Sequence, residues 1–240
     1  MSALGKGLAG LFGAAAMLAL VPQSAQAGTV VAASGPSATS YPVGTQIGDT
    51  QRISLRAGDS LTVLDNGGTR VLRGPGTFIL ARQGGSTRNR AYAALTTQRS
   101  ATRARTGAVR NTQSGQEIRN PNLWYVNVAA AGKMCLTDRN AIPLWRADTT
   151  METVYTITGA GEPASVTFPE KEMLASFDSE AGLADGATLT ISGPDLETPT
   201  RVSFVFLDET PADAEATAQA LIENGCMGQL EQLSTAMVEG

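Results

Sequence analysis

The chain has 240 residues, 42% of them hydrophobic and 17% charged, and carries a net charge of −4. It contains no histidine, which excludes imidazole general bases and the usual histidine-ligated zinc sites. The charge is uneven: residues 28–119 hold twelve arginines and four acids, a net of +8, whereas residues 120–240 hold five basic and eighteen acidic residues, a net of −13. The overall acidity argues against a nucleic-acid partner.

Residues 1–27 have the pattern of a cleavable signal peptide. Lys6 precedes the apolar run Leu8–Val21, and Ala25-Gln26-Ala27 supplies the small residues of a signal-peptidase site. Cleavage after Ala27 would place the protein in the periplasm or outside the cell, and an uncleaved membrane anchor is the alternative. No later stretch is long and apolar enough to cross a bilayer, so we expect no transmembrane segment after signal removal.

Residues 28–82 predict a small β meander. Thr29–Ala33 is typical of a first strand, and Tyr41–Ile47 contains proline and glycine, which favours a place at a sheet edge. Ile53–Leu80 is a series of short apolar runs separated by turn signals, and apolar and polar residues alternate over residues 53–57 and 61–63, with the period of half-buried strands. Within it, Asn66-Gly67 indicates a tight β-hairpin.

Residues 83–120 are rich in arginine and poor in apolar side chains, a composition typical of a solvated linker. Ala91–Arg105 has the composition of one short helix. Two other interpretations stay open: contact with the acidic half of the same chain, or a basic surface for an anionic envelope polymer or protein. The candidate contact residues are Arg88, Arg90, Arg99, Arg103, Arg105 and Arg110.

Residues 121–209 predict an antiparallel β-sandwich, because short apolar runs alternate with glycine- and proline-rich turns. The most apolar run, Arg201–Leu207, is expected to lie centrally in its sheet. The other predicted strands are Leu123–Val128, Met134–Leu136, Ile142–Trp145, Thr153–Thr158, Ser165–Phe168, Leu174–Phe177 and Thr188–Ile191.

Residues 210–240 predict a helical hairpin packed on the sandwich. Thr210-Pro211-Ala212-Asp213 is a start signal in which the threonine caps the helix and proline takes the first helical position. Gly225 is a stop signal, and a second helix over residues 227–238 would bury Leu230, Leu233 and Met237.

The two cysteines, Cys135 and Cys226, predict one disulfide in an exported protein. The bond would close a loop of about 90 residues, which the chain-entropy model values at about 4–5 kcal/mol. Free or metal-bound thiols are the alternative. Such a disulfide would attach the helical hairpin to an early strand of the sandwich.

Gly58-Asp59-Ser60-Leu61 matches the motif of a family of lipases and esterases, whose serine needs a histidine base. Since the chain has no histidine and a strand follows Ser60, we interpret these residues as a turn. Carboxylate groups offer acid–base chemistry on a glycan, but an acid-rich chain brings acids together by chance. The acids concerned are the pair Asp59 and Asp65, and the group of three formed by Asp178, Glu180 and Asp185. We predict no catalytic, cofactor or metal site.

The run from Leu55 to Phe78, LRAGDSLTVLDNGGTRVLRGPGTF, resembles the FecR-type extracytoplasmic β domain over about residues 53–79. The resemblance implies a bacterial envelope module for interaction or sensing. Iron-transport regulators of that family place an anti-sigma segment and a membrane helix before the β domain, whereas here a signal peptide precedes it. We therefore expect an exported, non-catalytic protein that binds a partner protein or an envelope polymer. A carboxylate-dependent glycan hydrolase and a structural subunit of a surface assembly are the alternatives.

Overall fold

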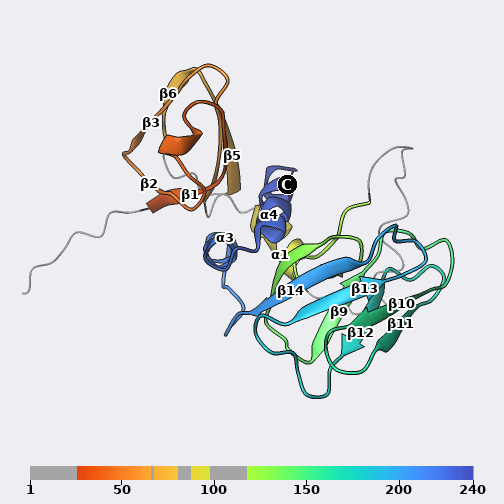
Figure 1. Cartoon of the computed structure of the whole chain (residues 1–240). Coiled ribbons are helices and arrows are strands. Elements are labelled where there is room, and N and C mark those ends of the chain that lie inside the picture. Colours follow the sequence, from red (N-terminus) through yellow and green to blue (C-terminus); the bar gives the residue numbers. More distant parts are fainter. Residues whose placement is uncertain (1–25, 66–67, 81–87, 98–117, 240) are drawn as a thin grey trace, which may run out of the picture.

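The computed structural model describes residues 26–65, 68–80, 88–97 and 118–239, and it is mainly β with a helical pair at the C-terminal end, as predicted. Two β units lie on either side of a group of helices (Figure 1). Among the described residues, no helix has the length and apolar character needed to cross a membrane. The predicted signal peptide lies outside the described residues except for Gln26 and Ala27, which begin the first strand.

The N-terminal unit contains a four-stranded sheet in the order β2-β1-β4-β5 and a separate antiparallel pair, β3-β6. β2 lies at a sheet edge, as predicted for Tyr41–Ile47, but the strand begins only at Gln46, because the N–H of Thr45 donates to the carbonyl of Pro42 and closes a turn before it. β4 and β5 form the predicted hairpin, in which Asp65 pairs with Gly68. The strands are β1 (Gln26–Ser34), β2 (Gln46–Gly48), β3 (Arg52–Leu55), β4 (Ser60–Asp65), β5 (Gly68–Arg73) and β6 (Gly76–Ile79).

Alternation along these strands gives the N-terminal unit a core of its own. In β3 the two apolar side chains are buried and the two polar ones are exposed, as the sequence period predicts. The core residues are Val30, Ile47, Ile53, Leu55, Leu61, Val63 and Leu80.

Two turns of this unit pack against each other. The N–H of Gly74 donates to the carbonyl of Asp59 at 3.0 Å. A Cβ on Gly74 would overlap the carbonyl oxygen of Arg56, so only glycine allows this approach.

The second unit has a five-stranded sheet in the order β11-β10-β13-β14-β8 and a three-stranded sheet in the order β12-β9-β7. β14 lies between two neighbours, as expected for the most apolar run. The strands are β7 (Val126–Asn127), β8 (Gly132–Leu136), β9 (Ala141–Trp145), β10 (Thr153–Thr158), β11 (Ala164–Phe168), β12 (Leu174–Asp178), β13 (Thr188–Ser192) and β14 (Thr200–Phe206).

Two details of this unit differ from the sequence prediction. β8 pairs with β14, and β7 with β9, in parallel rather than antiparallel orientation. The first is possible because five strands separate β8 from β14 in the chain, which leaves ample length for a crossover. The predicted strand over Leu123–Val128 shrinks to β7, because the side chain of Asn122 accepts from the N–H of Trp124 and holds the preceding residues in a turn.

The helices are α1 (Arg88–Thr96), α3 (Ala214–Glu223) and α4 (Met227–Glu239). The cap of α3 is Asp213, whose carboxylate accepts from the N–H of Ala216 at 2.8 Å, and not the predicted Thr210. Asp213 takes the cap because its extended backbone aims its side chain at the first turn. Gly225 follows α3 with a φ of 71°, in agreement with the predicted stop. The predicted residues of α4 are buried: Leu230, Leu233 and Met237.

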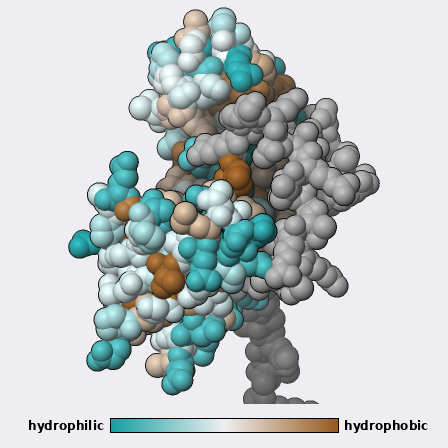
Figure 2. Space-filling view, turned by 90° about the vertical axis from the view of Figure 1, so that its right-hand side faces the viewer, coloured by the Kyte–Doolittle hydropathy of each residue, from teal (hydrophilic) through white to brown (hydrophobic). Residues whose placement is uncertain are grey.

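The hairpin of α3 and α4 contacts both β units rather than the sandwich alone. α3 packs against β1 and β4, whereas α4 packs against β1, β5 and β8. Val31 and Leu64 of the N-terminal unit belong to the same hydrophobic cluster as the sandwich core. In the space-filling view the two units form an upper and a lower lobe that meet at a waist (Figure 2).

Part of the arginine-rich segment belongs to this helical layer. The Tyr92 hydroxyl of α1 donates to the carbonyl of Pro211 at 3.1 Å and lies 2.8 Å from the hydroxyl of Thr217 in α3. The backbone N–H of Leu123 donates to the carbonyl of Leu95. α1 therefore begins three residues before the predicted Ala91, and it is docked on the acidic half of the chain, in agreement with that alternative, rather than being a solvated linker.

Candidate binding site

β8 is an edge strand whose backbone alternates between a paired side and an outward side. Its ladder with β14 ends where the N–H of Leu207 donates to the carbonyl of Leu136 at 2.7 Å, so the backbone of Leu136 faces β14. Backbone groups of successive strand residues point to opposite edges. Cys135 and Lys133 therefore direct their N–H and C=O groups to the outer edge of the sheet.

The side chain of Gln229 closes this edge at Cys135. Its Oε1 accepts from the N–H of Cys135 at 2.7 Å, and its Nε2 donates to the carbonyls of Cys135 and Leu123, each at 2.9 Å. Gln229 is 3% exposed. One buried amide thus replaces the next strand of the sheet at a single residue and leaves neither backbone group unpaired.

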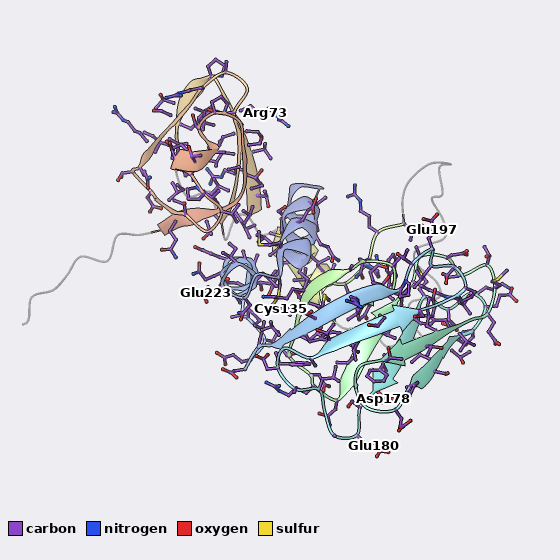
Figure 3. All side chains as sticks on the ribbon, viewed as in Figure 1. Arg73, Cys135, Asp178, Glu180, Glu197 and Glu223 are labelled. Atoms are coloured by element: carbon purple, nitrogen blue, oxygen red, sulfur yellow. A yellow bond between two sulfur atoms is a disulfide. The ribbon has the colours of Figure 1, made fainter. Side chains whose placement is uncertain are left out.

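The predicted disulfide joins the same point of β8 to the helices. Cys135 and Cys226 are bonded across a sequence separation of 91, with their Cα atoms 5.9 Å apart. Cys226 lies between α3 and α4, and Cys135 lies beside these helices in Figure 3. The bond and Gln229 together fix the beginning of α4 against the sheet edge.

A pocket of about 230 Å³ opens along the edge on the N-terminal side of Cys135. Its walls are the segment from Tyr125 to Met134, which includes β7 and the start of β8, and the first turns of α4. Two of the lining residues are glycines with open space beside them. A Cβ on Gly132 or Gly228 would meet no heavy atom within 4 Å. The apolar part is formed by Val126, Met134 and Val202, and the amides come from Asn120, Asn127, Gln229 and Gln232.

The pocket carries one positive charge within an acidic half of the chain. Among the described residues, Lys133 is the one charged residue in its lining, whereas residues 120–240 carry a net of −13. A Cβ on Gly225 would lie 3.5 Å from the Lys133 ammonium, which places this ammonium at the joint between α3 and α4. The same joint holds the C-terminal, negative end of the α3 dipole as well as the positive end of the α4 dipole, so the two dipoles oppose each other there. The Lys133 ammonium favours an anionic ligand group at this end of the pocket.

A second group of buried polar residues supports the far part of the sandwich. The hydroxyl of Tyr155 donates to the Asp195 carboxylate at 2.5 Å, and burial together with that carboxylate raises the pKa of Tyr155. Arg146, 2% exposed, donates to the carbonyls of Met151 and Pro169 and to two others in the neighbouring loops. These bonds tie loops together, and we assign them a structural role.

Asp59 and Ser60 hold a turn and begin a strand. The Asp59 carboxylate accepts from the backbone N–H groups of Ser37, at 2.9 Å, and of Arg56. Burial acts to raise the pKa of Asp59, but hydrogen bonds from the Ser37 hydroxyl and from both N–H groups hold it below 3.8. Ser60 is the first residue of β4, paired with Ser34 and Arg73. The geometry agrees with the interpretation of this motif as a turn.

The other predicted carboxylates have local partners. Asp65 forms an ion pair with Arg70 at 2.8 Å, and Asp185 accepts from the N–H of Phe206. Asp178 accepts from the Ser176 hydroxyl, and it lies with Glu180 at the end of the sandwich far from the helices (Figure 3). Among described residues, no group of three or more acids or cysteines is placed to hold a metal ion.

The structure describes two of the six arginines predicted to contact a partner. Arg88 and Arg90 lie in the first turn of α1. The remaining four, Arg99, Arg103, Arg105 and Arg110, lie outside the described residues. The residues that form the pocket were not predicted, because Lys133 and Gln229 are ordinary polar residues 96 positions apart that the fold brings together.

No family model, curated protein or solved structure matches the chain.

Proposed function

We propose that this is an exported, non-catalytic envelope protein that binds a partner protein in the pocket at the edge of β8. The main support for the proposal is that the backbone N–H and C=O of Lys133 face an open pocket. Gln229 occupies the same two groups of Cys135, two residues further along the strand. An uncovered strand edge is a ready template for another chain. The signal-peptide pattern and the resemblance to an envelope β domain support the cellular setting.

The helical layer supports a role as a binding scaffold. Residues that locate α4 also line the pocket, because Gln229 bonds β8 and Gln232 donates to the carbonyl of Asn120 at 2.9 Å. The same helix packs against β5 of the N-terminal unit, where the Thr69 hydroxyl donates to the carbonyl of Ser234 at 3.3 Å. A partner seated in the pocket would therefore be held in a fixed position relative to the FecR-like unit.

Site-specific photo-crosslinking in cells that naturally make the protein tests the proposal. A benzophenone amino acid would replace Met134, which lines the pocket, and, as a control, Val154, which is 45% exposed on β10. We expect a defined protein adduct from position 134 that position 154 does not give. The same adduct from both positions, a glycan adduct, or none at position 134 would contradict the proposal.

A matched pair of variants shows whether an adduct depends on the pocket. Gly228→Leu would fill the open space beside β8, and the variant should fold, because leucine is a good helix former whereas glycine is less favourable than alanine by about 0.8–1 kcal/mol. Glu231→Leu adds the same side chain to an exposed position of α4 outside the pocket lining. The adduct should disappear in the first variant and persist in the second.

A further inference from the structure

We propose that the ligand of this pocket is the carboxyl terminus of an extended polypeptide, which adds to β8 as a short parallel strand. This inference rests on the proposed function and specifies the part of the partner that the pocket recognises. It follows from three properties of the site: an exposed strand edge, a closed end and a positive charge at that end.

The exposed edge supplies backbone recognition. The N–H and C=O of Lys133 point outward by the alternation that also directs Cys135 toward Gln229. Within the part of the chain that the structure describes, no hydrogen bond to the outward groups of Lys133 is found. A peptide laid along Gly132–Met134 would complete them, as added strands do in other peptide-binding domains.

The closed end limits how far the added strand can run. Gln229 already occupies the backbone groups of Cys135, one residue beyond Met134. At the other end, Ala130, Ala131 and Gly132 are exposed to solvent. A polypeptide can therefore enter past Ala130 and must stop at Gln229, which suits a chain terminus better than a continuous segment. Because this direction is that of β8 itself, the added strand is parallel.

The charge at the closed end selects which terminus fits. Lys133 and Cys135 are two residues apart on β8, so their side chains lie on the same face of the sheet. The Cys135 side chain reaches Cys226, and the Lys133 ammonium lies by Gly225, both in the joint before α4. The ammonium is positive, and none of the described residues that line the pocket is acidic. A carboxylate is stabilised there and a terminal ammonium is repelled.

The volume fits such a ligand. At about 230 Å³, the pocket is smaller than the ~300–1,000 Å³ of typical small-molecule sites. Its backbone edge is three residues long, from Gly132 to Met134. The apolar residues Val126, Met134 and Val202 provide surface for one buried side chain of the peptide.

Capture of short peptides by the immobilised protein tests the inference. The probes are two pools of random N-acetylated tetrapeptides, one with a free carboxyl terminus and one with a terminal amide, quantified by mass spectrometry. We expect at least tenfold more capture of the free-acid pool. Lys133→Met should reduce that capture about tenfold, Gly228→Leu should abolish it, and Glu231→Leu should leave it unchanged. Methylating alternate amide nitrogens of the peptides should weaken capture, because those N–H groups bond β8.

Equal capture of the acid and amide pools would overturn the inference, as would capture that survives Gly228→Leu. These outcomes are separable from failure of the proposed function. A partner crosslinked at position 134 together with equal capture of both pools would leave partner binding in place and remove the carboxylate. An absence of any adduct and of any captured peptide would remove both.

Discussion

The two β units are built from contacts of very different range. In the N-terminal unit the strand pairings span at most 35 residues, between Thr29 and Leu64, and the Asp59 turn bonds Arg56, three residues away, and Ser37, twenty-two away. In the second unit the contacts that close the edge of β8 span 91 residues at the disulfide and 94 at the Gln229–Cys135 bonds. Shorter-range contacts therefore build the strands of the first unit, whereas the edge of the second depends on the last helices of the chain.

The pocket is formed by residues that are far apart in the sequence. Its walls come from the beginning of the sandwich and from α4, which the chain adds last. Both tryptophans, Trp124 and Trp145, are buried in this second unit. Tryptophan fluorescence therefore reports unfolding of the sandwich core, which Val31 and Leu64 of the N-terminal unit also join, and the following variants use it to test the comparison.

The largest effect is expected from removing the disulfide. Cys135→Ser with Cys226→Ser should lower the free energy of unfolding by about 2–5 kcal/mol, because the denatured chain regains the freedom of a long loop. Urea unfolding followed by tryptophan fluorescence measures the change. A loss below about 1 kcal/mol would show that the helices hold the sheet edge without the covalent bond.

Replacing Gln229 tests the hydrogen bonds that join α4 to β8 beside the disulfide. Gln229→Leu would remove the partner of the buried N–H and C=O of Cys135 and of the C=O of Leu123, at a cost of about 3 kcal/mol. Gln232→Leu is the matched control, since Gln232 is half-buried and makes one bond, to Asn120, so about 1 kcal/mol is expected. Equal losses in the same urea experiment would argue against Gln229 as the closure of the edge.

A smaller effect is expected at the helix from the arginine-rich segment. Tyr92→Phe removes the bonds of α1 to Pro211 and Thr217 and should cost about 1 kcal/mol. The control is Tyr41→Phe, which removes the hydroxyl that accepts from the N–H of Ser54 in the N-terminal unit. Only the first should shift the tryptophan-detected midpoint; a shift in both would mean that the units unfold together.

The smallest effect is a pH dependence confined to the N-terminal unit. Since the pKa of Asp59 is lower in the folded state than its usual 3.8, the carboxylate stabilises the fold above about pH 4, and this contribution is lost as the pH falls further. Thermal unfolding of this unit, followed by circular dichroism at pH 6 and pH 3, should show a smaller pH effect in Asp59→Asn than in the natural sequence. An unchanged difference would show that other acids cause it.

The sequence predicted features that depend on short-range chemistry. The alternation of apolar and polar residues predicted strands, Asn66-Gly67 predicted the β4–β5 hairpin, and Gly225 predicted the end of α3. The disulfide was predictable because only two cysteines exist. Contact of the arginine-rich segment with the acidic half of the chain was only an alternative interpretation of the sequence, and Tyr92 was not identified as the contact, because its partners lie about 120 residues away. No local signal marks Gln229 as a closure of a strand edge, so the pocket was not predictable.

The most direct test of the pocket is amide hydrogen exchange of β8 measured residue by residue by NMR. In the free protein we expect slow exchange at Met134, which bonds β14, and at Cys135, which bonds Gln229, with fast exchange at Lys133 between them. A captured free-acid peptide should then slow exchange at Lys133. Slow exchange at Lys133 in the free protein, or no change when the peptide binds, would contradict binding at this edge.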